Sequence, residues 1–267
     1  MNSKSRTKRI GLGAIVALTL TFLTGCSTKT EFDRIGMPNP ATKEGPRILS
    51  LWQGSWIAAM VVGVLVWGLL IWAIIVYRRR EGDPAPKQVR YNMPIEILYT
   101  IAPLVMILTL FFFTQRDQTI LTRISNDQAH TVNVVGWRWS WAFNYLEEGA
   151  YDVGTPGQRP ELWLPINEKV KFELSSPDVI HSFWVPAFLM KMDIVPGRRN
   201  AFEITPNKLG TFYGKCAEFC GVDHSRMLFE VKVVTAKEYA AHISQLKSIG
   251  QSGVLDNGRS PVAGDQQ

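Results

Sequence analysis

The sequence predicts a two-helix transmembrane hairpin followed by an all-β domain on the outer side of the membrane. Two runs with almost no charged residues, 56–77 and 94–114, are each long enough to cross a bilayer at about 20 residues per crossing. An arginine-rich segment separates them. After residue 116 the chain changes to short apolar runs broken by Gly, Pro and Asn, which is typical of an all-β domain.

Residues 1–25 predict a signal peptide of the lipoprotein type. Four basic residues precede the apolar stretch 10–22, and Leu23-Thr24-Gly25-Cys26 resembles a lipobox. We therefore expect cleavage before Cys26, a lipid on Cys26, and an exported N-terminal segment over 26–55. An uncleaved first membrane helix is the alternative, which the short apolar run and the small residues beside the cysteine disfavour.

Charge distribution orients the hairpin and argues against nucleic acid as a partner. The connection 78–93 is rich in Lys and Arg, so it is expected on the cytoplasmic side, with both flanks outside. The chain carries a formal charge of +6, with 13 Lys+Arg against 6 Asp+Glu up to Phe113 and 16 against 17 after it. The positive excess thus accompanies the targeting and membrane segments. A buried hairpin of a soluble protein would need neither the export signal nor the arginine-rich loop.

The exported domain, 115–236, reads as a β-sandwich or small barrel. Turn signals separate predicted strands at 131–145, 161–164, 170–174, 201–204, 210–213 and 227–234. Alternate positions of the first strand are apolar or aromatic and predict one largely aromatic face: Val135, Trp137, Trp139, Trp141, Phe143 and Tyr145. Such a face mostly packs in a core, but it can also carry electrons or dock a partner. A C-terminal helix is expected at 237–249 and a disordered tail at 250–267.

A dense cluster of metal-binding residue types marks the candidate site. The run Cys216-x3-Cys220-x3-His224-x2-Met227 gathers two thiols, an imidazole and a thioether, and His181 lies upstream. A disulfide is one interpretation, because the domain is exported, but it leaves the His and Met spacing unexplained. A Cys2His2 zinc site is the second, although zinc does not use a thioether. Copper is the third, since thiolate, thioether and imidazole are its donor set. The pattern alone leaves all three open.

Three stretches of the chain resemble cytochrome c oxidase subunit II: 181–186, 191–198 and 213–227. The similarity covers both membrane helices and nearly all of the exported domain. Among the disulfide, zinc and copper interpretations, it favours copper. It implies a bacterial haem–copper oxidase subunit whose cupredoxin-like sandwich holds two copper ions as a dinuclear CuA centre. The implied ligands are the bridging thiolates of Cys216 and Cys220, one imidazole each from His181 and His224, the thioether of Met227 and the backbone carbonyl of Glu218. The side chain of Glu218 is expected to bind magnesium at the boundary with subunit I.

The resemblance also assigns roles to two residues outside the ligand run. Trp139 occupies the position where an electron from cytochrome c enters. The residues around Glu96 indicate only that its charge stabilises the start of a helix. In the family, however, the position of Glu96 in Glu96-x2-Tyr99-Thr100-x2-Pro103 is that of an acid at the mouth of a proton pathway. The chain departs from the family pattern at two positions, with Tyr99 in place of Trp and Arg138 in place of Gln. A cation beside Trp139 would disfavour a basic soluble cytochrome c.

The implied function is electron transfer within an oxidase. The chain would accept electrons from a c-type cytochrome and pass them to haem in subunit I, where oxygen is reduced to water and protons are translocated. We expect subunits I and III, the bilayer and a cytochrome donor, in a membrane supercomplex, as partners. The sequence has no Cys-x-x-Cys-His, so haem belongs to the partners. A quinol oxidase subunit II would lack the copper ligands, and an exported copper-binding lipoprotein would not need two spanning helices. The roles of Asp178 and Asp193 stay open.

Overall fold

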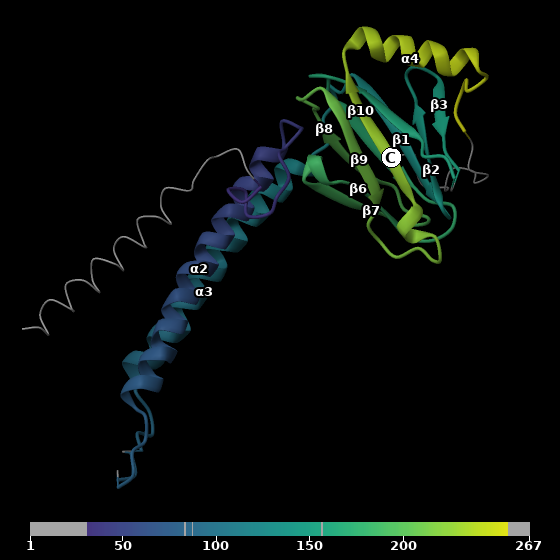
Figure 1. Ribbon diagram of the computed structural model, residues 1–267. Helices are drawn as coiled ribbons and strands as arrows, with labels where there is room; N and C mark the ends of the chain where they lie inside the picture. The colour runs from purple at the N-terminus through teal and green to yellow at the C-terminus, as the bar shows by residue number, and fades with distance from the viewer. Residues whose placement is uncertain (1–30, 83, 87, 156, 256–267) are drawn as a thin grey trace, which may run out of the picture. The chain divides into compact units, whose positions relative to one another are not determined.

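The computed structural model describes residues 31–82, 84–86, 88–155 and 157–255 (Figure 1). The predicted signal peptide, Cys26 and the last residues of the tail lie outside these ranges. The described part of the N-terminal unit, 31–39, contains a turn in which Arg34 Nε donates to the carbonyl of Met37 at 2.9 Å. From residue 40 onward the described chain forms two long helices, two β-sheets and a shorter helix.

The two long helices exceed the apolar runs that predict them. Helix α2 spans Gly45–Val76, with a proline in its first turn, and α3 spans Met93–Leu121. Hydropathy missed the polar ends of both helices because it measures only the part that suits a membrane. Those ends are joined where Arg47 Nη1 pairs with Asp117 Oδ1 at 3.0 Å, and only 5% of the Asp117 side chain is exposed. Both helices are long and apolar enough to cross a bilayer.

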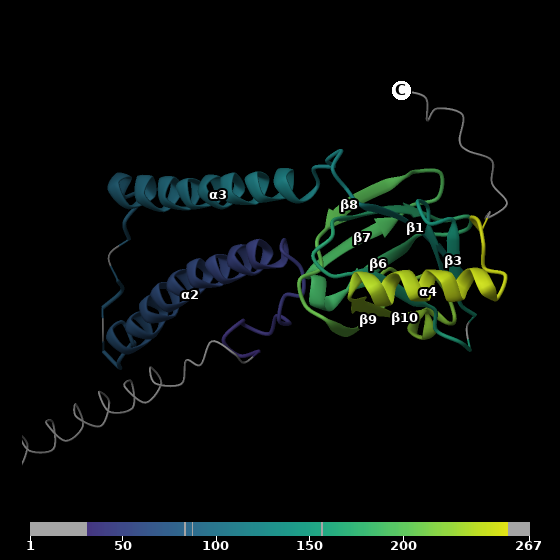
Figure 2. The same ribbon diagram turned by 90° about the horizontal axis from the view of Figure 1, so that it is seen from above.

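The exported domain is a sandwich of two five-stranded sheets (Figures 1 and 2). One sheet has the strand order β3-β2-β1-β5-β8, and the other has the order β4-β10-β9-β6-β7. The pairs β1–β5 and β4–β10 are parallel and the rest are antiparallel. The strand bounds are β1 His130–Trp137, β2 Ser140–Tyr145, β3 Ala150–Val153, β4 Glu161–Pro165, β5 Val170–Ser175, β6 His181–Val185, β7 Met190–Ile194, β8 Asn200–Ile204, β9 Gly210–Cys216 and β10 Leu228–Val234.

Aromatic side chains fill the space between the sheets. Phe183 of β6 stacks on Phe229 of β10 with ring centroids 5.0 Å apart, and Trp141 meets Phe229 edge-on at 5.2 Å. These rings are at most 1% exposed. Gly214 is required beside them because a Cβ there would stand 2.1 Å from the Phe229 ring. The metal-ligand candidates at the end of β9 and the start of β6 are therefore attached to a rigid core.

The prediction of one long strand over 131–145 was wrong. The chain turns at Arg138–Trp139, a cis peptide bond, and Trp137 pairs with Ser140 across the hairpin. Because Gly136 pairs with Trp141, the side chains of Trp137 and Trp141 project to opposite faces of the sheet. The expected continuous aromatic face is therefore interrupted at the turn. A two-residue reversal is hard to detect inside an apolar run without an Asn-Gly or Asp-Gly signal.

The C-terminal region also differs from its prediction. Helix α4 spans Ala236–Ser248 and begins with a capping box between Thr235 and Glu238. Residues 250–255, predicted as part of a disordered tail, instead bond to the β2–β3 region. Gly253 N–H donates to the carbonyl of Gly149 at 2.8 Å, and Leu255 N–H donates to Asn144 Oδ1 at 2.8 Å. Composition cannot reveal such bonds, because their donors are backbone N–H groups that nearly every residue has.

A short segment before α2 is bound to the sandwich, and we call residues 40–44 the strap. Ala41 N–H donates to the carbonyl of Ala187 at 2.8 Å, and Lys43 N–H donates to that of Thr205 at 2.9 Å. The side chain of Glu44 accepts the Thr205 N–H at 3.0 Å. Ala41 is fully buried. The exported domain is thus completed by residues that precede both membrane helices.

Candidate metal centre

Two neighbouring strands and one loop bring the candidate ligands together. Cys216 ends β9, and Cys220, His224 and Met227 follow on the loop that leads into β10. The loop closes on itself because Cys216 N–H donates to the carbonyl of Met227 at 3.0 Å. His181 begins β6, which pairs with β9 through Phe183 and Cys216. The antiparallel register therefore places His181 beside the first cysteine.

The donor atoms form a compact buried cluster. His181 Nδ1 lies 3.9 Å from Cys216 Sγ, and the two cysteine sulfurs are 3.9 Å apart. His224 Nδ1 lies 3.4 Å from Cys220 Sγ, and Met227 Sδ lies 3.8 Å from the same sulfur. The Glu218 carbonyl oxygen is 3.2 Å from Cys216 Sγ. His181 and Met227 are fully buried, and both cysteines are at most 5% exposed.

This donor set fits a soft metal ion. Both cysteines are free, and their sulfurs are well beyond the distance of about 2.05 Å found in a disulfide. Two thiols, two imidazoles, a thioether and a carbonyl exceed the four ligands of a tetrahedral zinc site. Thiolate, thioether and imidazole together are the ligands that copper prefers in electron-transfer proteins. The geometry is thus consistent with a copper site.

The two thiols differ in acidity. Burial opposes ionisation of Cys216, but hydrogen bonds from His181 and from backbone groups outweigh it and lower its pKa to about 7. Burial and the negative charge of Cys216 raise the pKa of Cys220. Cys216 is therefore the more acidic thiol of the pair.

Asp178 holds His181 in place, a role that the sequence left open. Its Oδ1 lies 2.9 Å from His181 Nε2, so the imidazole directs Nδ1 toward Cys216. The backbone N–H of Arg138 donates to the other oxygen at 2.8 Å. Burial raises the pKa of Asp178, but hydrogen bonds from Arg138, His181 and Val179 outweigh it and lower the value to about 2. An acid three residues before a candidate ligand is a signal that could have found this contact.

Trp139 touches the ligand loop directly. Its indole Nε1–H donates to the carbonyl of Cys220 at 3.1 Å. Gly221 allows this approach, because a Cβ there would lie 3.1 Å from the indole and the residue has a φ of 122°. Trp141 likewise donates to the carbonyl of Met227, at 3.3 Å, from inside the core. Trp139 is half-buried, so it connects the protein surface with the candidate ligands.

The side chains of the remaining predicted site residues are not among the donors of this cluster. Glu96 is in the first turn of α3, where its Oε1 accepts the Asn92 N–H at 2.8 Å. That contact matches the helix-start interpretation. The Glu218 side chain is exposed. Asp193, whose role was open, accepts from Ser182 Oγ at 2.8 Å and from Lys191 Nζ at 2.8 Å. Cys26 lies outside the described residues.

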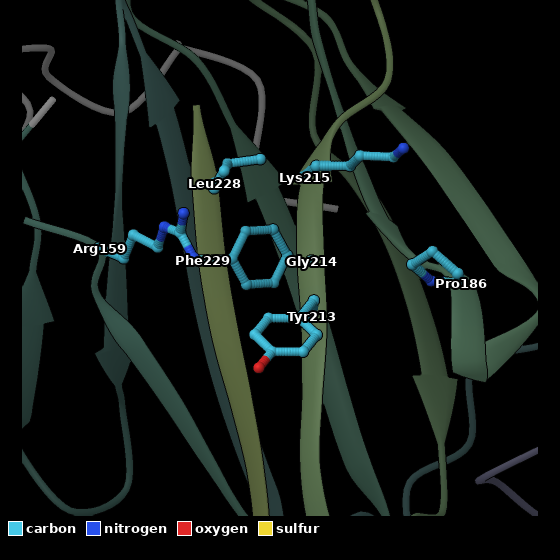
Figure 3. Close-up of a pocket in the computed structure, with 7 residues that line it drawn as sticks. All are labelled: Arg159, Pro186, Tyr213, Gly214, Lys215, Leu228 and Phe229. Carbon is cyan, nitrogen blue, oxygen red and sulfur yellow. The ribbon is translucent and has the colours of Figure 1, made fainter. Parts of the chain in front are cut away.

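A separate open cavity of about 280 Å³ lies on β9 and β10 and includes none of the predicted ligands (Figure 3). Its lining residues are Arg159, Pro186, Tyr213, Gly214, Lys215, Leu228 and Phe229. Figure 3 shows Arg159 and Lys215 at opposite sides of the Phe229 ring.

Fold and site together define a membrane-anchored, cupredoxin-like protein with a candidate copper centre. Residues 31–116 match the family model for the transmembrane domain of cytochrome c oxidase subunit II, and residues 157–234 match that for its periplasmic domain. The chain therefore belongs to the cytochrome c oxidase subunit II family. It is an oxidase subunit with two membrane spans and its C-terminal domain on the outer face.

Curated relatives agree with this assignment. A probable cytochrome c oxidase subunit 2 of Streptomyces avermitilis is 51% identical over 280 residues, covering 90% of this chain and 88% of the relative. The cytochrome c oxidase subunit 2 of Mycobacterium tuberculosis is 32% identical, covering 89% of this chain and 82% of the relative. The solved periplasmic domain of subunit II from Bradyrhizobium japonicum is 31% identical, with a TM-score of 0.43, and covers 47% of this chain and 99% of that one.

Proposed function

We propose that this subunit accepts electrons from a c-type cytochrome at a dinuclear copper centre and passes them to haem in subunit I. There, oxygen would be reduced to water and protons translocated. The observation that carries the proposal is the buried cluster in which donor atoms of His181, Cys216 and Cys220 all lie within 4.8 Å of one another. The thioether of Met227, the imidazole of His224 and the Glu218 carbonyl add donors beside the two sulfurs.

The arrangement of the donors favours two ions over one. Each imidazole lies nearest to a different sulfur, His181 to Cys216 and His224 to Cys220. Two thiolates that bridge a metal pair would leave one imidazole for each ion. When bound, the copper pair would supply one-electron redox chemistry shared over two metals and two sulfurs. The buried cysteines and Met227 would keep water away, and the strands would hold the ligands fixed during reduction.

Further residues have proposed roles around this centre. Trp139 would receive the electron at the surface, because its indole bonds to the carbonyl of the ligand Cys220. The side chain of Glu218 is exposed and would bind magnesium at the boundary with subunit I. Glu96 would stand at the mouth of a proton pathway, and Cys26 would carry a lipid. Subunits I and III and a c-type cytochrome, held in a membrane supercomplex, are the proposed partners.

The test is metal analysis of the full chain in detergent, since the strap makes residues 40–44 part of the domain. The protein is loaded with copper under reducing conditions, and its metal content and paramagnetic resonance spectrum are recorded. Two coppers per chain that share one unpaired electron are expected. Cys220→Ser should abolish the shared signal, because it removes one bridge. One zinc per chain, or a Cys216–Cys220 disulfide after such loading, would overturn the proposal.

A further inference from the structure

Arg138 and Asp178 form an ion pair beside Trp139, and the two partners differ in exposure. Arg138 Nε lies 3.3 Å from Asp178 Oδ2, with 50% of the arginine side chain exposed against 19% of the aspartate. Of the two charges in this pair, the one that reaches the surface is therefore the positive one. Trp139 follows Arg138 in the chain, so this positive charge borders the proposed point of electron transfer.

The Asp178 carboxylate is already fully engaged within the domain. Besides Arg138 and His181, it accepts the Val179 N–H at 2.6 Å and the Ser176 hydroxyl at 3.2 Å. A half-exposed ion pair contributes little to stability, so the guanidinium is not needed to hold this carboxylate. The Arg138 backbone N–H, at 2.8 Å, does so whatever side chain stands at this position. The guanidinium is therefore available to a molecule that docks from outside.

The neighbouring surface adds exposed apolar side chains. Val222 is 90% exposed and follows Gly221, where an added Cβ would lie 3.1 Å from the Trp139 indole. Phe219 is 78% exposed and precedes Cys220, whose carbonyl the indole contacts. Apolar residues with an arginine among them are typical of protein–protein interfaces. The surface thus suits a protein partner.

We propose that Arg138 determines donor specificity: it favours an electron donor that places a carboxylate, and not a lysine, next to Trp139. The inference rests on the proposed electron-transfer function and deepens it by naming the chemistry of the partner. Opposite charges across an interface accelerate association and suppress wrong partners, and the effect falls with ionic strength. The Arg138 side chain acts here on docking alone, and it contacts none of the proposed copper ligands.

The experiment uses the assembled oxidase with wild-type chain, Arg138→Gln and Arg138→Glu. Two soluble c-type cytochromes serve as probes, one with an acidic and one with a lysine-rich haem edge. Binding affinity and the rate of copper-site reduction are measured at low and high salt. We expect Arg138→Glu to weaken binding of the acidic cytochrome about tenfold at low salt and to strengthen that of the basic one. The affinities of the Arg138→Gln oxidase should lie between those of the wild type and of Arg138→Glu. High salt should remove the differences in affinity among the three.

Lys169→Gln is the matched control. Lys169 is also a partly exposed cation in an ion pair, with Asp127 at 2.6 Å. Lys169 lies just before the first residue of β5, and Arg138 lies just after the last residue of β1. Because β1 and β5 are parallel and both begin at the pair His130–Val170, the two cations lie at opposite ends of the sheet. The copper resonance spectrum should be the same in every variant, because the Arg138 backbone bond to Asp178 is kept.

Three results would overturn the inference: unchanged affinities in Arg138→Glu, equal changes in Lys169→Gln, or reduced assembly of the oxidase with unchanged affinities. The last would place Arg138 against another subunit. Failure of the proposed function is distinguishable from all three. In that case the wild-type oxidase itself would show no shared copper signal, or neither cytochrome would reduce it.

Discussion

Asp178 Oδ1 lies 2.9 Å from His181 Nε2, on the far side of the imidazole from the nitrogen that faces Cys216. A carboxylate in this position fixes the ring and increases its strength as a metal ligand. The same carboxylate is held by the backbone of Arg138, next to Trp139. One side chain therefore links the proposed docking surface with a proposed copper ligand.

Asp178→Ala is expected to weaken copper retention by about 10- to 100-fold, because His181 loses the partner that orients it. The measurement is copper loss to a chelator, followed by the optical spectrum of the centre. Asp178→Asn should restore most of the affinity, since its amide oxygen can still accept from the imidazole. Asp193→Asn is the control, because Asp193 bonds to Ser182 and Lys191 instead of a ligand. Equal copper loss from Asp178→Ala and Asp193→Asn would contradict the role of Asp178 in positioning His181.

Met227→Leu is expected to keep both coppers bound while shifting the reduction potential and slowing electron transfer. Leucine fills the same buried space but lacks the thioether, whose sulfur lies 3.8 Å from Cys220 Sγ. Metal content, redox titration and the resonance spectrum measure the effect. Complete loss of metal would instead show that Met227 is needed to build the site.

Trp139→Phe is expected to slow oxidation of the cytochrome while the copper spectrum stays intact. Phenylalanine keeps an aromatic ring but loses the indole N–H that bonds to the Cys220 carbonyl. Stopped-flow reduction by a c-type cytochrome measures the rate. Trp137→Phe is the control, because Trp137 pairs with Ser140 on the other side of the turn. An unchanged rate in Trp139→Phe would remove this residue from the electron path.

His130 is expected to make stability depend on pH. Its Nδ1 lies 2.6 Å from Glu148 and its Nε2 lies 2.9 Å from Glu168, a geometry that needs both nitrogens protonated. Hydrogen bonding to Glu148 raises the pKa of His130 against the opposing effect of burial, and Glu168 adds to the increase. A raised folded-state pKa gives stability that is fully present below about pH 6.5 and is lost as the pH rises through the folded value.

His130→Gln should therefore lower the free energy of unfolding by about 1 kcal/mol at pH 6 and by less at alkaline pH. Chemical denaturation of the full chain across pH measures this. His242→Gln is the control with the opposite sign, because burial lowers the pKa of His242 and its contribution is lost as the pH falls. If the free energy of unfolding of His130→Gln depended on pH as that of the wild type does, His130 would not be the source of the pH dependence.

The sequence was sufficient for the fold class and for the cluster of candidate ligands. Long uncharged runs predict membrane helices because a bilayer imposes length and polarity on every spanning segment. The close spacing of Cys216, Cys220, His224 and Met227 placed four donors together without any knowledge of the fold. His181 was a candidate from its residue type, but its position 35 residues before Cys216 could not show that it joins the cluster, because that depends on the pairing of β6 with β9. The Glu218 carbonyl was expected only from the resemblance.

What the sequence did not reveal depends on backbone geometry. The turn at Arg138–Trp139 lies inside an apolar run, so the alternating pattern of a strand continues through it. The pattern therefore predicted that all these aromatic side chains share one face of the sheet, whereas they lie on both faces. The contact of Asp178 with Arg138 arises from that turn and was equally hidden. The bonds of residues 250–255 and of the strap involve main-chain atoms, which carry no compositional signal.

The strap also has a consequence for how the exported domain is assembled. Glu44 and Thr205 are separated by 161 positions along the chain, and the whole membrane hairpin lies between them. Closing a flexible loop of that length would cost about 4 to 5 kcal/mol in chain entropy. Insertion of the hairpin returns the chain to the side of the membrane where it began, which shortens the effective loop. Topologically the hairpin is an insertion within a discontinuous folding unit, so correct membrane insertion becomes a condition for completing the domain.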